Sequence, residues 1–74
     1  MMVKVYSKNG CIQCKMTKRW LDGHNIPFES INVEEDQKAI DRLKASGFQR
    51  LPVTELTSGR MFTGFDLNEL KSLI

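Results

Sequence analysis

The chain has 74 residues, of which 41% are hydrophobic and 27% are charged, and its formal net charge at pH 7 is +2. This length suits a single domain, 1–74, with a core of limited size. The mild charge and the scattered lysines and arginines argue against binding to nucleic acid or to an anionic membrane. No apolar stretch approaches the ~20 residues that a membrane span needs.

The start of the chain has no cationic segment followed by a long apolar core, so we expect no secretory signal. Cys11 and Cys14 are the only cysteines. Cytosolic proteins rarely keep a permanent disulfide. We therefore expect a cytoplasmic protein in which a bond between these two cysteines is transient.

The first half of the chain alternates between strand and helix signals. Residues 2–6 predict a strand, and residues 14–21 predict a helix. Residues 23–25 should end this helix, and Pro27, which cannot continue it, follows them. Residues 28–33 alternate apolar and polar side chains, with the period of a second strand. We expect a structural role for Thr17, a solvated His24, and three core-facing side chains, Met16, Trp20 and Leu21.

A second helix is expected over residues 34–46. Its apolar stripe consists of Ala39, Ile40 and Leu43. Glu34 and Lys38 have the spacing of an exposed i,i+4 pair. Gly47 suits the left-handed position after a helix, and Phe48 can make the hydrophobic contact that closes it.

A hairpin is expected next. Residues 51–56 predict a strand with Pro52 near its start, and residues 61–63 predict a short partner strand. Between them, Ser58 and Gly59 form a turn signal.

The last helix has a marked beginning. Asp66 can cap it, and Glu69 stands at the third helical position, as in a capping box. Phe65 and Leu70 have the spacing of a hydrophobic staple. The residues expected on the buried face are Leu67, Leu70, Leu73 and Ile74.

These elements predict an α/β fold with the order β-α-β-α-β-β-α. The first two strands, joined by a helix, should form a parallel pair with a right-handed crossover. The hairpin should extend the sheet in antiparallel fashion. The expected result is a four-stranded mixed sheet covered by three helices.

Cys11 has an informative position between the first strand and the first helix. Unpaired backbone N–H groups at a helix start favour an anion. Because the thiolate is the reactive form of cysteine, this position predicts a lowered pKa for Cys11. A stapling disulfide or half of a metal site is the alternative, although a staple closing so short a loop would constrain the unfolded chain little. The strand–helix setting favours redox catalysis.

Several segments together resemble a known family. The order of elements, the Cys-Ile-Gln-Cys motif and the Leu-Pro-Val at 51–53 resemble the thioredoxin superfamily in its minimal glutaredoxin-like form. The chain is most similar to the NrdH-type redoxins, glutaredoxin-like electron donors to class Ib ribonucleotide reductase. The matching segments are 6–8, 11–14, 17–19, 31–33, 47–53 and 63–65. Cys-x-x-Cys is common to the superfamily, but Gln before the second Cys, then Gly-Phe-x-x-Leu-Pro-Val and a later Gly-Phe, is much more specific.

One segment departs from the family pattern. Members usually have Trp-Ser-Gly-Phe-Arg-Pro before the last helix, whereas residues 62–67 here read Phe-Thr-Gly-Phe-Asp-Leu. Any partner contact or loop stiffening that the family's Arg and Pro provide is therefore not implied for this chain.

The position of each cysteine predicts its role. Cys11, exposed at the turn, should be the nucleophile that attacks a partner disulfide, and Cys14, one helical turn in and more buried, should resolve the mixed disulfide. The resemblance implies a role for the proline that follows Leu51. Pro52 would be a cis-proline facing the active-site disulfide, leaving the backbone of Leu51 to pair with an extended peptide. The alternative for Pro52 is an edge-strand proline with a trans bond.

For other residues near the cysteines, two interpretations remain open. Ile12 and Gln13 would tune the reduction potential, or they are solvent-exposed fillers. Lys8 or Lys15 would help to lower the pKa of Cys11, or both are simply solvated. Gly64 and Phe65 would line the substrate groove, although the staple role alone would also explain Phe65.

The resemblance also implies partners. The substrate would be the cysteine-bearing C-terminal tail of a class Ib ribonucleotide reductase. Because the chain lacks the segment that holds glutathione in glutathione-dependent glutaredoxins, we expect thioredoxin reductase to recycle the oxidised monomer. No cofactor is expected beyond a redox-active Cys11–Cys14 disulfide.

Two alternatives are a glutathione-dependent glutaredoxin and an iron–sulfur or metal-binding module. The first typically has Cys-Pro-Tyr-Cys and a Gly-Gly-x-Asp-like segment, and this chain has neither. Structural zinc takes four ligands, and one chain offers two thiolates with His24 remote in sequence. We expect no metal site.

Overall fold

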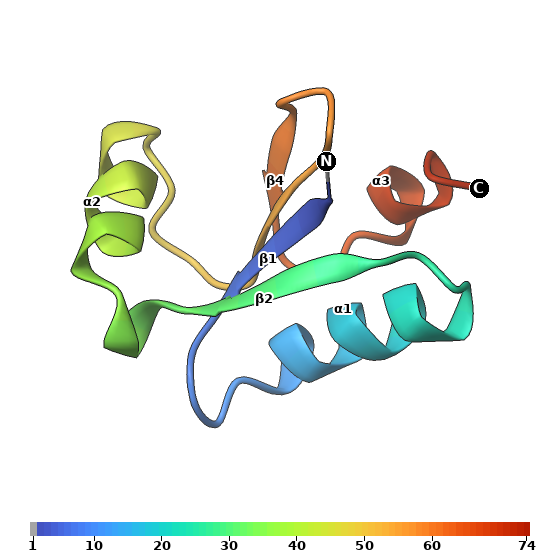
Figure 1. The fold of residues 1–74 in the computed structure, drawn as a ribbon, viewed down its shortest axis with the longest axis horizontal. Helices are drawn as coiled ribbons and strands as arrows, with labels where there is room; N and C mark the ends of the chain where they lie inside the picture. Colours follow the sequence, from blue (N-terminus) through green and yellow to red (C-terminus); the bar gives the residue numbers. More distant parts are fainter. Residues whose placement is uncertain (1) are drawn as a thin grey trace.

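The computed structural model describes residues 2–74 and places four strands in one mixed sheet (Figure 1). The elements in chain order are β1 (Val3–Ser7), α1 (Ile12–Gly23), β2 (Phe28–Asn32), the 3-10 helix η1 (Val33–Glu35), α2 (Gln37–Ala45), β3 (Val53–Glu55), β4 (Met61–Thr63) and α3 (Leu67–Lys71). The strand order is β2-β1-β3-β4, with β1 parallel to β2 and antiparallel to β3, and β3 antiparallel to β4. The predicted α/β order and four-stranded mixed sheet are confirmed.

Alternation along β1 divides the core between the two faces of the sheet. Val5 packs in one cluster with Leu21 of α1 and Leu70 of α3. Its neighbour Tyr6 packs in a second cluster with Leu43 of α2. The helices accordingly lie with α1 and α3 on one side of the sheet and α2 on the other (Figure 1). None of the helices among residues 2–74 is long and apolar enough to cross a membrane.

The helix predicted over 34–46 is divided in two. The side chain of Asn32 accepts from the backbone N–H of Glu34 at 2.9 Å, and this contact starts η1. Asp36 then adopts an extended backbone and caps α2 by accepting from the N–H of Ala39 at 3.1 Å. Such polar side chains compete with a continuous helix by bonding to nearby backbone N–H groups. The prediction of an i,i+4 pair between Glu34 and Lys38 was therefore wrong.

The end of α2 follows the prediction. Gly47 has a φ of +82°, the left-handed conformation that favours glycine. Its N–H donates to the carbonyl of Lys44 at 3.1 Å, and the N–H of Phe48 donates to the carbonyl of Leu43 at 2.9 Å. Phe48 also packs against the cluster that contains Leu43. This pattern closes the helix and directs the chain back toward β3.

The start of α3 is capped by Asp66, which accepts from the N–H of Glu69 at 3.2 Å. Phe65 packs against the cluster containing Leu70, as the staple spacing predicted. The prediction that the Glu69 side chain completes a capping box with the backbone N–H of Asp66 was wrong. The carboxylate of Glu69 instead accepts two hydrogen bonds from Arg60, at 2.6 and 2.7 Å, because the β3–β4 turn brings that guanidinium beside the helix.

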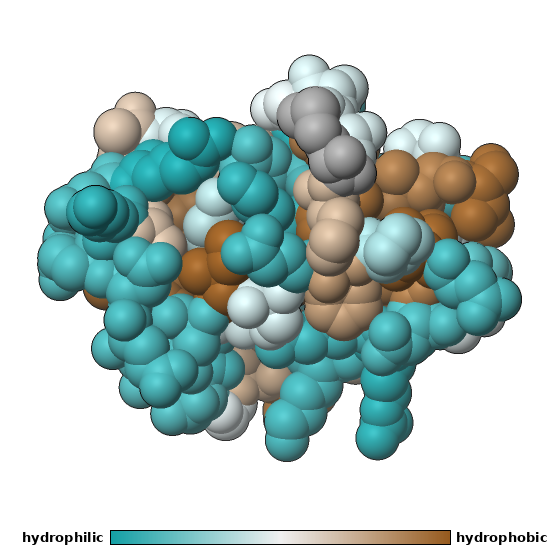
Figure 2. All heavy atoms as spheres, in the orientation of Figure 1, coloured by the Kyte–Doolittle hydropathy of each residue, from teal (hydrophilic) through white to brown (hydrophobic). Residues whose placement is uncertain are grey.

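The helix α3 has only five residues and buries less than expected. Leu70 is fully buried and Leu73 is half-buried, but the predicted burial of Leu67 and Ile74 was wrong. They are 42% and 69% exposed: Leu67 is the first residue of this short helix, and Ile74 lies beyond its end. Figure 2 shows hydrophobic surface on this side of the molecule, where Figure 1 has α3 and the C-terminus.

The helix α1 begins two residues earlier than predicted, and Met16 does not face the core as expected. Met16 is 42% exposed, whereas Leu21 is fully buried and Trp20 packs against the core. His24, the C-cap, is exposed, and its ring centroid lies 4.1 Å from that of Trp20. Thr17 is buried and donates to the carbonyl of Gln13 at 3.0 Å. This contact supports the structural role predicted for Thr17.

Candidate active site

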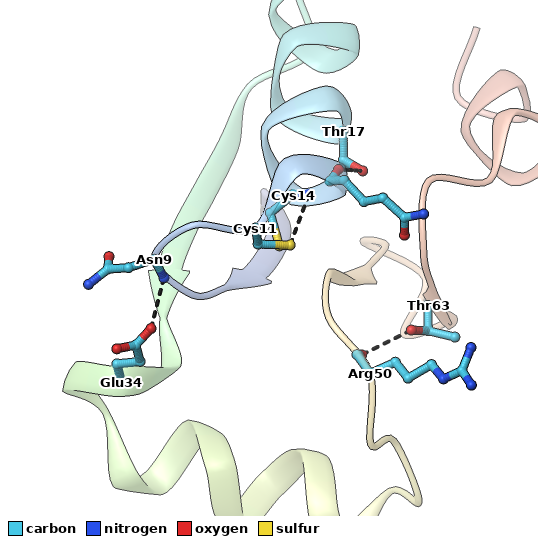
Figure 3. The surroundings of a disulfide bond; sticks show 8 residues. Asn9, Cys11, Cys14, Thr17, Glu34, Arg50 and Thr63 are labelled. Atoms are coloured by element: carbon cyan, nitrogen blue, oxygen red, sulfur yellow. Dashed lines mark hydrogen bonds between the residues drawn. A yellow bond between two sulfur atoms is a disulfide. The ribbon is translucent and has the colours of Figure 1, made fainter.

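The two cysteines occupy the first turn of α1 and form a disulfide, with their Cα atoms 5.2 Å apart. Cys11 is the N-cap, and its Sγ accepts a hydrogen bond from the backbone N–H of Cys14 at 3.2 Å (Figure 3). Cys14 is only 2% exposed, whereas Cys11 is partly exposed. An attacking partner can therefore reach the sulfur of Cys11 more easily than that of Cys14.

The helix start provides the electrostatic setting of Cys11. Its N–H groups carry partial positive charge, which favours a negatively charged sulfur at the N-cap. Lys8 and Lys15 are both exposed, and neither takes part in the two ion pairs found among residues 2–74. The hydrogen bond from the Cys14 N–H and the helix start are structural features that favour a thiolate at Cys11, and the contribution of Lys8 or Lys15 stays a prediction.

The loop before Cys11 is connected to the end of β2 by side chains. The backbone N–H of Asn9 donates to the carboxylate of Glu34 at 2.8 Å (Figure 3). The side-chain amide of Asn32 donates to the side-chain oxygen of Asn9 at 3.0 Å. Gly10, between Asn9 and Cys11, has a φ of +73°. The loop is therefore held on its outer side and turned sharply before Cys11.

A second loop approaches the disulfide from the other side. The Leu51–Pro52 peptide bond is cis, the geometry that the resemblance implied. The carbonyl of Pro52 accepts from the N–H of Gly64 at 2.9 Å, and the carbonyl of Arg50 accepts from the Thr63 hydroxyl at 2.9 Å (Figure 3). These two hydrogen bonds hold the proline loop to the end of β4. Within residues 2–74, the backbone of Leu51 makes no hydrogen bond.

A shallow groove of about 430 Å³ lies between the start of α1 and the start of α3. Gln13 lines it on one side, and its side-chain oxygen is 3.8 Å from the place where a Cβ on Gly64 would stand. The residues on the other side are Thr63, Gly64, Phe65, Asp66, Leu67 and Asn68. Phe65 both lines this groove and packs against the core, so the two roles predicted for it, in a groove and in a hydrophobic staple, are compatible.

A more apolar hollow of about 460 Å³ lies between α2 and the segment that leads to Pro52. Leu51 lines this hollow together with Phe48 and Ile40, and Lys44 and Arg50 also border it. Leu51 is half-buried and Pro52 is fully buried. Leu51 therefore connects this hollow with the proline loop.

The remaining predicted site residues lie in different surroundings. Ile12 is 74% exposed beside Cys11, so its side chain is available to a partner. His24 lies at the far end of α1, away from the cysteines. Residues 2–74 contain no group of three or more His, Cys, Asp and Glu side chains that could hold a metal ion.

Sequence reasoning missed the side chains that hold the two loops. Asn9, Asn32 and Glu34 were not assigned to the site, nor were Thr63 and Arg50 as loop contacts. A signal existed for Asn32, because parallel pairing places it opposite Ser7 at the end of β1, next to the cysteine loop. No local pattern connects Thr63 with Arg50, since only the antiparallel pairing of β3 and β4 brings them together.

Comparison with known proteins agrees with this arrangement. The glutaredoxin family model matches residues 3–56. The chain is 43% identical to the glutaredoxin-like protein NrdH of Lactococcus lactis strain IL1403 over 72 residues, which are 97% of this chain and 99% of that protein.

Two solved structures show the same fold. The NrdH-redoxin of Escherichia coli has a TM-score of 0.93 and 34% identity, over 100% of this chain and 96% of that one. A glutaredoxin from Archaeoglobus fulgidus has a TM-score of 0.81 and 28% identity, over 96% and 83% of the two chains. With a disulfide at the helix start and a cis-proline loop beside it, the chain belongs to the NrdH-type, glutaredoxin-like thiol-disulfide oxidoreductases of the thioredoxin superfamily.

Proposed function

We propose that this protein is a dithiol electron carrier that reduces protein disulfides, with Cys11 as nucleophile and Cys14 as resolving cysteine. The observation that carries the proposal is the asymmetry of the pair. Cys11 is partly exposed at the helix start and its sulfur accepts the Cys14 N–H, while Cys14 lies buried behind it. The carrier of electrons is the cysteine pair itself, without a further cofactor.

The reaction proceeds by two thiol–disulfide exchanges. The Cys11 thiolate attacks one sulfur of the partner's disulfide, forms a mixed disulfide and releases the other partner sulfur as a thiolate. The Cys14 thiolate then attacks the Sγ of Cys11, forming the Cys11–Cys14 bond and releasing the second partner thiolate. Two electrons pass to the partner, and the two protons lost by the cysteines are balanced by those that the released thiolates take up.

The proposed substrate is the extended C-terminal tail of a class Ib ribonucleotide reductase. Membership in the NrdH-type redoxins supports this choice. The unpaired backbone of Leu51 can add an extended chain by strand-like pairing, next to the disulfide that Cys11 attacks. Because the net charge is only +2, specificity for this tail would come from the pairing beside the disulfide more than from electrostatic steering.

The proposed source of electrons is thioredoxin reductase and not glutathione, with the protein acting as a monomer in the cytoplasm. A single Gly64 followed by Phe65 stands where a glutathione-dependent glutaredoxin typically has its Gly-Gly-x-Asp-like segment, and Gln13 faces this position. The E. coli NrdH-redoxin, which shares this fold, is described as having a thioredoxin-like activity profile.

Two recycling systems run side by side test the electron source. The oxidised protein is supplied with NADPH and thioredoxin reductase, or with NADPH, glutathione reductase and glutathione, and reduction of a model disulfide is followed. We expect turnover with thioredoxin reductase and little with glutathione. Efficient turnover with glutathione alone would identify a true glutaredoxin instead.

A second assay tests the substrate. Deoxyribonucleotide synthesis by a class Ib ribonucleotide reductase is measured with NADPH, thioredoxin reductase and this protein at micromolar concentration. We expect synthesis to depend on the protein and to be absent with Cys11→Ser. If a generic dithiol supports the reductase equally well and this protein adds nothing, the chain is a general disulfide reductase.

A further inference from the structure

Three hydrogen bonds among Asn9, Asn32 and Glu34 form a closed ring on the outer side of the cysteine loop. The Glu34 carboxylate accepts from the Asn9 N–H at 2.8 Å, and the Asn9 side-chain oxygen accepts from the Asn32 amide at 3.0 Å. The Asn32 side-chain oxygen in turn accepts from the Glu34 N–H at 2.9 Å. Every donor in the ring is paired with an acceptor, so the three residues hold one another in place.

The ring joins two segments that parallel pairing has already brought together. Ser7, the last residue of β1, is opposite Asn32, the last residue of β2. Beyond Ser7 the chain has only Lys8, Asn9 and Gly10 before Cys11 begins α1 as its N-cap. Fixing Asn9 therefore limits where the sulfur of Cys11 can lie.

The three hydrogen bonds lie at the surface, and Asn9 and Glu34 are both exposed. Hydrogen bonds in such places contribute little to global stability, because water competes for the same groups. Their position directly before the nucleophile gives them a different consequence. In the oxidised protein the disulfide itself holds Cys11 against the first turn of α1, but in the reduced protein this covalent restraint is absent.

We propose that Glu34 is a positioning residue for Cys11, holding the cysteine loop through Asn9 when the disulfide is open. In the reduced protein this contact keeps the Cys11 sulfur within reach of the Cys14 N–H, which stabilises the thiolate. The inference rests on the proposed role of Cys11 as nucleophile and is independent of the partner proteins.

The charge of Glu34 acts in the opposite direction to its positioning effect. A carboxylate near a thiol disfavours the thiolate and raises its pKa. The other charges close to Cys11 in the sequence, on Lys8 and Lys15, favour the thiolate. If Glu34 acted only through its charge, its removal would make Cys11 more reactive. If it acts by positioning, its removal makes Cys11 less reactive, so the sign of the change separates the two roles.

The redox equilibrium should also change. Because the positioned Cys14 N–H stabilises the Cys11 thiolate, which exists only in the reduced form, loss of the ring should destabilise the reduced form more than the oxidised form. The equilibrium with dithiothreitol should therefore shift toward the oxidised protein. A threefold shift in this equilibrium corresponds to a reduction potential about 14 mV more negative for a two-electron couple.

The test compares Glu34→Ala, Glu34→Gln and Glu35→Ala. Glutamine keeps an oxygen acceptor for the Asn9 N–H without the charge. Glu35 is an exposed neighbour in the same 3-10 helix and takes no part in the ring, so its variant is the matched control for a lost carboxylate. The measurements on the reduced proteins are the rate of alkylation by iodoacetamide and the thiolate absorbance as a function of pH. The dithiothreitol equilibrium is measured for each variant.

We expect Glu34→Ala to slow alkylation by about threefold or more, to raise the pKa of Cys11 and to shift the dithiothreitol equilibrium by a similar factor. Glu34→Gln should restore the alkylation rate to within about twofold of wild type, and Glu35→Ala should leave it unchanged. Asn9→Ala, which changes no charge, should also slow alkylation, because it removes the hydrogen bond from the Asn32 amide to the Asn9 side-chain oxygen.

Three results would overturn the inference. The first is faster alkylation in both Glu34 variants, which would show that only the charge matters. The second is an unchanged rate in Glu34→Ala and Asn9→Ala, and the third is an equal change in Glu35→Ala. Reduction of a model disulfide by the wild-type protein is measured in parallel. Its absence would contradict the proposed function, whereas a Glu34 variant that behaves as wild type contradicts the positioning role alone.

Discussion

The disulfide lies between two loops that are built in different ways. The cysteine loop, residues 8–11, lies between β1 and α1, and its side-chain contacts come from Asn32 at the end of β2 and from Glu34 in η1. The proline loop, residues 50–52, is held by Thr63 and Gly64 at the end of β4. The first loop presents the reacting sulfur, and the second presents an unpaired backbone beside it. Activation of the proposed nucleophile and binding of the partner chain should therefore respond to separate substitutions.

Replacement of each cysteine by serine should have the largest effect. Cys11→Ser should abolish disulfide reduction, because no thiolate remains at the helix start. Cys14→Ser should instead trap a mixed disulfide with the substrate, because nothing remains to attack the Sγ of Cys11. Mass spectrometry of the two variants after incubation with a model disulfide protein distinguishes these outcomes. An adduct on Cys11→Ser together with an inert Cys14→Ser would reverse the assignment of roles.

Glycine to alanine substitutions on the two loops should separate their functions. Gly10 and Gly64 have φ values of +73° and +81°, so alanine at either position should lower the free energy of unfolding by about 1 kcal/mol. Gly10→Ala should slow alkylation of Cys11, because it disturbs the turn that leads into the N-cap. Gly64→Ala should leave alkylation nearly unchanged and raise KM for an extended peptide disulfide, because alanine disfavours the positive φ that directs the N–H of residue 64 to the carbonyl of Pro52.

The control for both is Gly59→Ala. Gly59 has a φ of +95° and lies in the β3–β4 turn, where an added Cβ would meet nothing within 4 Å. Gly59→Ala should lower the free energy of unfolding by a similar amount while leaving both the alkylation rate and KM unchanged. Equal kinetic effects in all three variants would mean that loss of stability, and not loop position, governs the activity.

Thr63→Val should have a smaller effect, limited to the proline loop. It removes the hydroxyl that donates to the carbonyl of Arg50 and keeps the shape of the side chain. A typical hydrogen bond contributes about 0.5–1.5 kcal/mol and this exposed one should lie at the lower end, so KM for a peptide disulfide should rise by about twofold. Alkylation of Cys11 should not change, and Thr57→Val, in the exposed turn, should change neither quantity. A slower alkylation in Thr63→Val would contradict the separation of the two loops.

Tyr6→Phe should change stability alone and only slightly. The Tyr6 hydroxyl donates to Glu55 at 3.1 Å, and Glu55 also pairs with Arg42 at 2.8 Å. Burial, followed by the contact with Glu55, raises the pKa of Tyr6 above its usual value of about 10. The folded state therefore favours the protonated phenol. This contribution to the free energy of unfolding is complete below pH ~10 and is lost as the pH rises through the higher pKa of Tyr6 in the folded protein.

The free energy of unfolding of the wild type should accordingly decline at alkaline pH, and the Tyr6→Phe variant should decline less. Denaturant unfolding at neutral and alkaline pH measures the difference. Alkylation of Cys11 at neutral pH should be the same in both proteins, since Tyr6 contacts neither loop through its hydroxyl. Parallel curves for the two proteins across this range would show that Tyr6 does not titrate differently on unfolding.

The boundaries that sequence reasoning placed well are those with strong local signals. Asp66, Gly47 and the turn at Ser58 and Gly59 were identified because capping and left-handed positions depend on a few neighbouring residues. The division of the helix near Asp36 was missed, although its cause is also local. Asn32 and Asp36 both offer capping side chains, and the apolar stripe that follows suggested one continuous helix.

Burial was predicted less well than helix and strand type. Met16, Leu67 and Ile74 were expected to face the core but are exposed. Apolar spacing indicates which residues share a helix face, but the contacts of that face depend on the length of the helix and on the elements beside it. Glu69 shows the same limit, because Arg60, from a different element, binds the carboxylate that would otherwise return to Asp66.

The sequence by itself determined the order of elements and the place of the cysteine pair at a helix start. It did so because strand alternation, helix caps and the Cys-Ile-Gln-Cys motif act over a few residues. Only the tertiary structure decided which side chains hold the two loops around that pair. The contacts of Glu34 with Asn9 and of Thr63 with Arg50 join residues 25 and 13 positions apart. They exist because parallel pairing of β1 with β2 and antiparallel pairing of β3 with β4 align the strand ends, which no local pattern specifies.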